Sequence, residues 1–521
     1  MVEFQKILFI KVEKRIKSAL GLTPKNNPRI PTPFWYNKAM INLKIGEKIR
    51  LQIIRMGING EGIGYFKQRL IFVPYALPEE EVTVEITENA PRFSRAKLVK
   101  IDKRSKYRVT PEDKDFAALS SSHIMHLAYP QQLEFKRDLL RQALEKYKPA
   151  GWKDYELRET LGQSDWKGYR NKLTYQLRRL KSGTVIAGLY EENSHRLVNL
   201  EHCLVQDPVT QKVANRACQL MTKYRLPIED ERQTRGLRTI MVRRSQMTGE
   251  IQVILVTSAP IKLDGQTWPV LGAKGPRGKN AGQQQKFVKL DQMLSDLTKD
   301  FDDIVTVAVN YHPKKSSEIY GDMTQIVFGE KEKITEGLLG YSFELSPRAF
   351  FQLNTKQAEV LYAEVVKALS PKRDDRVIDA YCGAGTIGFA VAKKVKSVHG
   401  MDTVSESVAD ARANAARLGF KNCHYEIGKA EKVMANMYKS GQRPTAVIVD
   451  PPRTGLDEEL LKMLVHYKPE RLVYVSCNVS TLAKDLKVLA EAYEVEYIQS
   501  VDMFPQTARC EAVVKLTKKG E

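Results

Sequence analysis

Residues 376–385 read RVIDAYCGAG, and this stretch decides the fold of the C-terminal part of the chain. An apolar strand ends at the acidic residue Asp379, and the glycines that follow let the backbone approach a ligand closely before a helix begins. The segments SVHGMD (397–402), TAVIVDPPR (445–453) and RLVYVSCN (471–478) are again short apolar runs that end in small or acidic residues, with helical segments between them. This alternation predicts a doubly wound, mainly parallel sheet that binds its ligand at the carboxyl ends of the strands.

The glycines after the first strand are compatible with two cofactors. Gly383, Gly385 and Gly388 have the G-x-G-x-x-G spacing of a nucleotide-binding loop, and Asp402 ends the next strand. An acid at that position can bind ribose hydroxyls, which NAD and S-adenosylmethionine (SAM) both carry. The loop alone therefore does not choose between these two cofactors.

A second motif ends another strand of the same sheet. Asp450, Pro451 and Pro452 form an acid–Pro–Pro sequence of the kind that nucleotide-modifying methyltransferases place where the target base binds, and this favours SAM. Enzymes that methylate exocyclic amines usually continue the motif with an aromatic residue that stacks on the base. Arg453 is a poor stacking platform, so methylation of an amine is disfavoured. The alternative is that Pro451-Pro452 has a purely structural role as a simple Pro-Pro turn.

A cysteine stands at the tip of the last of these strands. Buried cysteines are often structural, but Cys477 shares the carboxyl edge of the sheet with Asp450 and the glycine loop. Uracil C5 is a weak nucleophile, and a thiolate that adds at C6 turns C5 into an enolate that attacks a methyl donor. A base must then remove the C5 proton so that the thiol can leave. We expect Cys477 to be this nucleophile, with the helix N-terminus behind it favouring the thiolate.

The composition indicates a cytoplasmic protein with a polyanionic partner. The 521 residues contain 83 Lys+Arg and 62 Asp+Glu, a net charge of +21 that suits nucleic acid. The six cysteines include no C-x-x-C pair, which argues for a reducing compartment and against a disulfide framework. No apolar run approaches the roughly 20 residues of a membrane span, and the opening segment is too charged for a secretory signal.

The chain is expected to divide into an N-terminal extension and linker (1–41), a small β-barrel (42–101), a central RNA-binding α+β domain (102–345) and the sheet domain (346–521). The strand spacing and the glycine-rich turn before residue 62 indicate an oligonucleotide-binding type of barrel. An amphipathic helix over 128–149 is a candidate to pack on the sheet domain.

The central domain supplies the expected RNA-binding face. The stretch GYRNKLTYQLRRLKSG (168–183) interleaves basic with aromatic residues: Arg170, Lys172, Arg178, Arg179 and Lys181 with Tyr169 and Tyr175. On a strand this pattern would place cations beside aromatic rings, which suits RNA backbone and base stacking. A solvated strand face is the alternative. The stretch LGAKGPRGKNAGQQQ (271–285) has no apolar period and predicts a basic loop.

Several motifs occur together in one order: FQLN (351–354), DAYCGAGT (379–386), DPPRTGL (450–456), SCN (476–478) and TARCEAVVKL (507–516). As a set they resemble the RNA uracil-5 methyltransferase family (RlmD/RlmCD/TrmA-like enzymes), and the resemblance covers most of residues 42–521. It implies an N-terminal TRAM barrel of the oligonucleotide-binding type and a C-terminal Rossmann-like SAM-dependent methyltransferase domain.

The resemblance also implies roles for individual residues. Cys477 matches the nucleophile, and Glu511 matches the base that takes the C5 proton. Five further residues match positions that contact SAM, the last of them where the cofactor meets the target base: Gln352, Tyr381, Thr386, Asp402 and Asp450.

The sequence departs from the family pattern at two places. Val479 replaces the proline that commonly follows Ser-Cys-Asn, and the chemistry does not need that ring. Many relatives bind a [4Fe–4S] cluster through a C-G-G-C motif where this chain has Leu-Ser-Ser-Ser (119–122), which leaves Cys203 as the one matching ligand. We therefore expect no iron–sulfur cluster. His123 and His126 lack a matching ligand set, so no metal site is expected either.

These observations predict a monomeric, cytoplasmic SAM-dependent enzyme that makes 5-methyluridine in RNA, with 23S ribosomal RNA favoured and two target sites conceivable. Transfer RNA is the alternative substrate for the same chemistry. A non-catalytic RNA-binding or assembly protein is the alternative from another class, and the intact Cys477 and Glu511 argue against it. DNA cytosine-5 methylation is disfavoured, because those enzymes usually have Pro where Ser476 precedes the cysteine.

Overall fold

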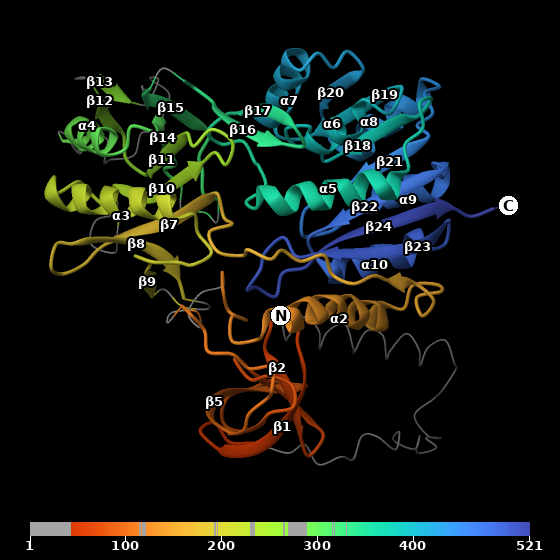
Figure 1. Ribbon diagram of the computed structural model, residues 1–521, viewed down its shortest axis with the longest axis horizontal. Helices are drawn as coiled ribbons and strands as arrows, with labels where there is room; N and C mark the ends of the chain where they lie inside the picture. The colour runs from red at the N-terminus through yellow and green to blue at the C-terminus, as the bar shows by residue number, and fades with distance from the viewer. Residues whose placement is uncertain are drawn as a thin grey trace, which may run out of the picture.

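The computed structural model describes residues 43–113, 116, 121–191, 194, 196–229, 235–263, 266–268, 289–314, 316, 318–329 and 331–520. The expected N-terminal extension (1–41) and the basic loop (271–285) lie outside the described residues. Figure 1 shows a barrel at one end of the molecule, joined through helix α2 to two larger sheets that lie side by side.

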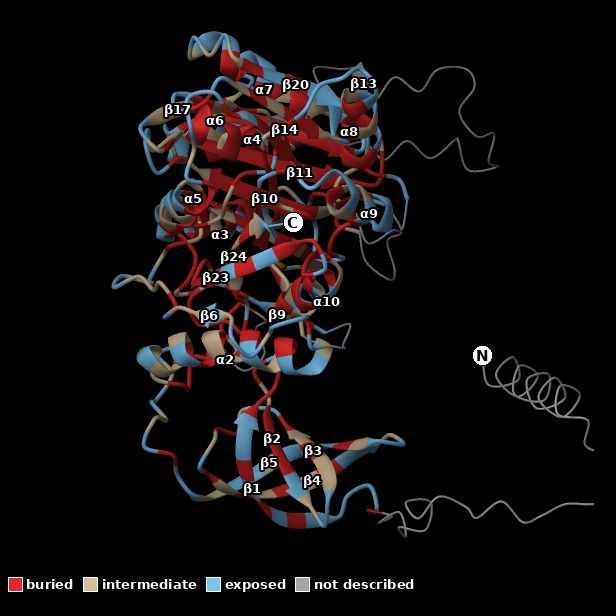
Figure 2. Cartoon of the chain, turned by 90° about the vertical axis from the view of Figure 1, so that its right-hand side faces the viewer, coloured by how far each residue is buried: buried red, intermediate tan, exposed pale blue. Residues whose placement is uncertain are grey.

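The N-terminal strands close into the predicted barrel, in the order β1-β2-β3-β5-β4. They are β1 (Lys48–Met56), β2 (Gly62–Phe66), β3 (Arg69–Val73), β4 (Glu81–Asn89) and β5 (Phe93–Lys103). Apolar residues at alternate positions, such as Ile49, Leu51 and Ile53, point into the barrel core, and Figure 2 shows this alternation of buried and exposed residues. The family's TRAM barrel is therefore confirmed as a closed five-stranded unit.

The central domain is built on a seven-stranded sheet of order β15-β14-β11-β10-β7-β8-β9. Its strands are β7 (Lys172–Arg179), β8 (Val185–Tyr190), β9 (Leu197–Asn199), β10 (Leu237–Arg244), β11 (Ile251–Thr257), β14 (Ile304–Tyr311) and β15 (Met323–Phe328). Helices α3 (Pro208–Lys223) and α4 (Leu290–Asp300) pack their apolar sides into one core with this sheet. A short hairpin of β12 (Ile261–Leu263) and β13 (Gln266–Trp268) stands apart from it.

The prediction that the two tyrosines of 168–183 lie beside the cations on an RNA-binding face is wrong. Tyr175 is buried in the core beneath α3, where its hydroxyl donates to Gln211 Oε1 at 3.0 Å. Tyr169 is buried too, and its hydroxyl donates to the carbonyl of Pro505 at 3.2 Å. The reason is the two-residue period of a strand, which puts Tyr175 on the side of its apolar neighbours and Lys172 on the other side.

The C-terminal sheet has eight strands in the order β20-β19-β18-β21-β22-β24-β23-β6. They are β18 (Arg376–Ala380), β19 (Ser397–Asp402), β20 (Cys423–Ile427), β21 (Ala446–Val449), β22 (Arg471–Ser476), β23 (Tyr493–Val501), β24 (Glu511–Lys518) and the short β6 (Glu156–Leu157). The strands from β20 to β22 are parallel, whereas β24 is antiparallel to β22 and β23. The chain direction across the sheet reverses between β18 and β21, and this is where doubly wound sheets bind ligands.

Helices cover both faces of this sheet (Figure 1), so its strands are apolar throughout. The helices are α5 (Thr355–Leu369), α6 (Thr386–Ala392), α7 (Ser405–Arg417), α8 (Ala430–Lys439), α9 (Glu458–Tyr467) and α10 (Val479–Leu489). The expected doubly wound class is confirmed, and the strands β21 and β22 of this sheet are buried along their whole length.

Segments from outside 346–521 complete the core of the C-terminal domain. Helix α2 (Tyr129–Tyr147) packs Phe135, Leu139 and Leu140 into the same core as α10. The hairpin of β16 (Ile334–Leu338) and β17 (Tyr341–Leu345) packs into the core around α5 and α7. These segments thus share the hydrophobic cores that flank the C-terminal sheet.

Candidate active site

A cavity of about 1190 Å³ opens at the carboxyl ends of the parallel strands. All seven residues that the sequence singled out line it: Gln352, Tyr381, Thr386, Asp402, Asp450, Cys477 and Glu511. Tyr381, Asp402, Asp450 and Cys477 end or follow parallel strands, which finish at one edge of the sheet. Glu511 reaches the same edge at the start of the antiparallel β24. The volume exceeds that of ordinary small-ligand pockets, so a cofactor and a nucleobase can fit together.

Backbone hydrogen bonds shape the glycine loop at one side of the cavity. Gly383 and Gly385 have φ values of 53° and 82°, which residues with a Cβ atom rarely adopt. Asp402 accepts hydrogen bonds from the backbone N–H groups of Gly383 at 3.0 Å and Val404 at 2.9 Å. These contacts tie the loop to the end of β19, next to the cavity.

The residues present fit SAM. A Cβ added at Gly383 would meet nothing within 4 Å, so the loop backbone faces open space there. Asp402 has a carboxylate at the place where ribose hydroxyls are bound in this fold. Asp379 is fully buried at the end of β18, and its Oδ1 has no hydrogen-bond partner among the described residues. Burial raises the pKa of Asp379 to about 7.

Cys477 lies directly before helix α10, as expected, but its thiol is not acidified. Burial, followed by the charges of Glu511 and Asp450, raises the pKa of Cys477 to about 11, against the lowering influence of Arg453. The thiolate is therefore not favoured in the free enzyme, contrary to the expectation from the helix N-terminus. Desolvation and two nearby acids outweigh the helix dipole, whose effect is typically below about 1 kcal/mol.

The two acids at Cys477 are themselves perturbed. Burial, followed by the charge of Asp450, raises the pKa of Glu511 to about 8, against the lowering influence of Arg453 and Lys136. Burial also raises the pKa of Asp450 to about 7. Both carboxyl groups can therefore gain and lose a proton near neutral pH, which is what acid–base catalysis requires.

The sequence pointed to Arg453 only as a poor stacking platform and missed Phe350 and Phe504 altogether. Arg453 lowers the pKa of both Cys477 and Glu511, and all three residues line the cavity. Phe350 is 61% exposed, directly before Phe351 and Gln352. A large exposed aromatic next to a motif is a signal that could have marked Phe350, whereas Phe504 carries no such signal in the sequence.

The residues at the family's cluster position do not fit an iron–sulfur cluster. Cys203 is 7% exposed and Ser121 is buried, and the hydroxyl of Ser121 lies close enough to influence the thiol. The remaining five cysteines lie elsewhere in the fold, so one thiol cannot supply the four that a cluster needs. His126 packs against the rings of Tyr75 and Phe116, and burial lowers its pKa to about 3.

Among the described residues, one group of acids lies close enough to hold a cation. Oxygens of Glu431, Asp457 and Glu459 lie within 4.8 Å of one another. Asp457 is the N-cap of α9 and accepts the N–H of Glu459 at 2.9 Å, while Glu431 faces Lys429 at 3.6 Å. The group thus has structural partners of its own, and nothing else at this site indicates a metal.

Two cations face each other where the central domain meets the catalytic domain. Lys172 on β7 and Arg243 on β10 are directly opposite in the antiparallel ladder. Arg243 is 3% exposed; its Nη2 donates to the carbonyl of Ala349 at 2.6 Å, and its Nη1 has no hydrogen-bond partner in the described part of the chain. Burial and the charge of Arg243 lower the pKa of Lys172 to about 7. Within the described ranges neither cation forms an ion pair, although like charges at such positions are destabilising.

These features together define the class: a SAM-dependent methyltransferase whose glycine loop, acid–Pro–Pro motif and cysteine share one cavity. The comparisons with known proteins agree. The profile of the tRNA (Uracil-5-)-methyltransferase family matches residues 324–519, and the TRAM domain profile matches residues 42–99. The chain belongs to this family of RNA methyltransferases and uses SAM as its cofactor.

Its relatives are similar over nearly the whole chain. An uncharacterized RNA methyltransferase of Lactococcus lactis is 68% identical over 92% of this chain and 93% of its own length. One from Streptococcus pneumoniae is 52% identical over 92% of this chain and 100% of its own length. The crystal structure of Pyrococcus abyssi tRNA (uracil-54, C5)-methyltransferase with S-adenosyl-L-homocysteine has a TM-score of 0.67, at 26% identity over 90% of this chain and 100% of that one.

Within the described residues, no helix combines the length and the apolar character needed to cross a membrane.

Proposed function

We propose that this enzyme methylates C5 of a uracil in RNA through a covalent bond between Cys477 and C6 of the base. The observation that carries the proposal is the meeting of Cys477, Glu511 and Asp450 at one side of a cavity whose other side is the glycine loop. Direct methyl transfer to an amine or hydroxyl needs no thiol. A cysteine beside two titratable acids is what methylation of an unreactive ring carbon requires.

The first step is the addition of the Cys477 sulfur to C6. The thiol has a raised pKa, so its proton must leave as the S–C6 bond forms, and Asp450, with a pKa of about 7, is the acceptor nearby. The electrons of the C5–C6 double bond move toward O4 and make C5 nucleophilic. SAM, when bound, supplies the electrophilic methyl group that C5 attacks.

The second step restores the aromatic base. Glu511 takes the proton from C5, the electrons of the C5–H bond form the C5–C6 double bond again, and the C6–S bond breaks. The Cys477 sulfur then regains its proton from Asp450, and Glu511 passes its own proton to water. The buried position of Glu511 raises its pKa to about 8, which makes it a stronger base than an exposed carboxylate.

The paired cations Lys172 and Arg243 suit the RNA backbone beside this cavity. Arg243 holds the carbonyl of Ala349, one residue before the exposed Phe350 that lines the cavity. A phosphate placed there would offset the repulsion between the two cations. A flipped-out uridine with its phosphate at Lys172 could thus enter the cavity, as base-modifying enzymes require.

Ribosomal RNA of the large subunit, 23S, is the proposed substrate, with one or two target uracils. This chain carries a TRAM barrel in addition to its central and catalytic domains. Such an additional RNA-binding unit suits a large folded RNA. Transfer RNA is the second candidate, because the Pyrococcus abyssi structure of similar fold is named a tRNA (uracil-54, C5)-methyltransferase.

The test is to incubate the enzyme and SAM with undermethylated 23S RNA and, separately, with unmodified transfer RNA. New 5-methyluridine in digested nucleosides is measured by mass spectrometry. Methylation of 23S RNA alone supports the proposed substrate, and methylation of transfer RNA alone replaces it by the second candidate. If neither RNA gains 5-methyluridine, the proposed reaction is wrong.

A further inference from the structure

The loop from Asp502 to Cys510 connects β23 to β24 and leads directly into Glu511. Phe504 of this loop lines the catalytic cavity, and Glu511 is the first residue of β24. The position of the carboxylate that removes the C5 proton therefore depends on how this loop is held. Helix α2, which lies far away in the sequence, contacts this loop through buried side chains, and Asn354 and Gln357 also donate to its carbonyls.

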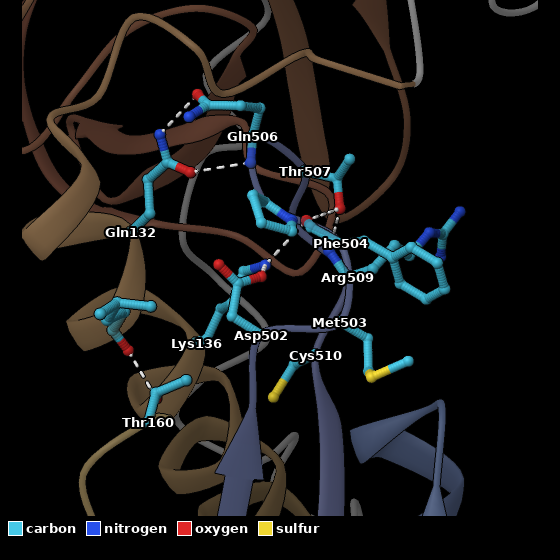
Figure 3. Close-up of polar contacts among 12 residues, drawn as sticks. Gln132, Lys136, Thr160, Asp502, Met503, Phe504, Gln506, Thr507, Arg509 and Cys510 are labelled. Atoms are coloured by element: carbon cyan, nitrogen blue, oxygen red, sulfur yellow. Dashed lines mark hydrogen bonds and ion pairs between the residues drawn. The ribbon is translucent and has the colours of Figure 1, made fainter. Parts of the chain in front are cut away.

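Lys136 of α2 holds the start of the loop (Figure 3). Its ammonium forms an ion pair with Asp502 and donates to the carbonyl of Phe504 at 3.0 Å. Both ion-pair side chains are 0% exposed, which is rare for Lys and Asp. The hydroxyl of Tyr129 donates to the other carboxylate oxygen of Asp502 at 2.8 Å.

Gln132, one turn before Lys136, holds the middle of the loop at Gln506. Its Nε2 donates to Oε1 of Gln506 at 2.9 Å, and its Oε1 accepts the backbone N–H of Gln506 at 3.0 Å. Figure 3 shows both contacts from one face of α2. Gln506 has φ = 69°, a left-handed conformation that costs energy for a residue with a Cβ atom. Gln132 therefore fixes a backbone shape that the loop would not adopt by itself.

A buried ion pair is a poor source of stability compared with an apolar contact of equal volume. Lys136 instead fixes the orientation of the loop, because its ammonium bonds two different groups, the Asp502 carboxylate and the Phe504 carbonyl. The positive charge of Lys136 also lowers the pKa of Glu511, which burial raises. The same side chain thus acts on both the position and the basicity of the carboxylate.

We infer that Lys136 and Gln132 are positioning residues for the removal of the C5 proton, an inference that rests on the proposed function. Glu511 acts only after the methyl group has reached C5. When its loop is loosened, addition of Cys477 and methyl transfer still proceed, but the C5–H bond is not broken. The C6–S bond then persists, and the methylated RNA remains attached to the protein.

The test compares the full-length wild type with Lys136→Met, Gln132→Leu and the double variant Lys136→Met/Asp502→Leu. Each is mixed with SAM carrying a labelled methyl group and the RNA that the wild type methylates. Denaturing gels quantify labelled RNA linked to protein, and nucleoside analysis quantifies released 5-methyluridine. Arg141→Met is the matched control, because it breaks an exposed ion pair with Asp138 on the same helix.

The expected result is that Lys136→Met and Gln132→Leu release product at least tenfold more slowly and accumulate the linked, methylated RNA, while Arg141→Met behaves as the wild type. The Lys136 variants should also need a higher pH for release, because Glu511 loses a neighbouring positive charge. If Lys136→Met fails to fold, the double variant, which leaves no unpaired buried charge, should fold and still accumulate the adduct.

Slow release without linked RNA, in variants that fold and bind RNA normally, would overturn the inference and leave the proposed function standing. An equal loss of adduct formation and release would overturn it as well, since that would place Lys136 in the earlier steps. If the wild type itself gives no 5-methyluridine, the proposed function fails first, so the two failures are distinguishable.

Discussion

Asn478 donates a hydrogen bond from its side-chain Nδ2 to the backbone carbonyl of Arg453 at 2.9 Å. This contact joins the turn that carries Cys477 to the loop that follows Asp450. The Oδ1 of the same side chain accepts the N–H of Ser480 at 3.1 Å and so caps helix α10. One amide thus links the proposed nucleophile, the acid–Pro–Pro loop and the helix behind them.

Replacing Asn478 by Ala should disturb this arrangement without removing any reacting group. The lost cap is expected to cost about 1 kcal/mol of stability, and the misplaced Cys477 should lower kcat roughly tenfold or more. Thermal melting and steady-state kinetics measure the two effects. Asn478→Asp, which can still cap the helix but cannot donate to Arg453, separates them: it should keep the stability and lose the rate.

Cys477→Ala should abolish methylation, with a loss of at least about a thousandfold. In the proposed reaction the thiol forms the bond on which methyl transfer depends, and the second cysteine that lines the cavity, Cys382, belongs to the glycine loop. SAM binding, measured by calorimetry, should stay unchanged, since the glycine loop is untouched. A variant that still makes 5-methyluridine would disprove covalent catalysis by Cys477.

The rate of product release should rise with pH through about 8. Glu511 accepts the C5 proton only when it is ionised, and burial raises its pKa to about 8 in the free enzyme. A profile of single-turnover release between pH 6 and 9 measures this limb. Glu511→Gln should abolish the limb together with turnover, whereas a profile flat over this range would show that Glu511 is not the base.

The same pKa shift predicts a pH-dependent stability. The pKa of Glu511 rises from 4.5 to about 8 on folding, so the folded protein binds this proton more tightly than the unfolded chain does. Stability therefore falls as pH rises from about 4.5 toward 8. Glu511→Gln should be more stable than the wild type at pH 8, by on the order of 1–3 kcal/mol, and equal to it near pH 4. Chemical denaturation at the two pH values tests this.

Lys172→Met should weaken RNA binding while leaving the protein as stable as before or more so. The variant removes one proposed phosphate contact, so the slope of log affinity against log salt should decrease by about one. It also relieves the repulsion with Arg243. Lys223→Met is the control, since Lys223 is paired with Asp296 at 2.8 Å. Equal salt slopes for wild type and Lys172→Met would remove Lys172 from the RNA interface.

The motifs of the C-terminal domain could be placed from sequence because each lies at the end of an apolar strand. Parallel strands bring their carboxyl ends to one edge, so Tyr381, Asp402, Asp450 and Cys477 were bound to meet there. Leu173, Tyr175 and Leu177 alternate as an inward apolar row, and this pattern alone indicates that Tyr175 is buried. Strand period, rather than mere interleaving of cations and aromatics, determines which side chains face a ligand.

The sequence by itself determined the strand–loop–helix units and the cavity edge where the motifs lie, because these follow from local patterns and parallel order. The proposed role of Glu511 came from the family resemblance instead. Only the tertiary structure decided how the reacting groups behave. The pKa of Cys477 is raised because folding buries it beside Glu511 and Asp450. The loop before Glu511 is held by Lys136, a contact across 366 residues of chain. Charge effects and packing depend on distances in space, which no local pattern of residues encodes.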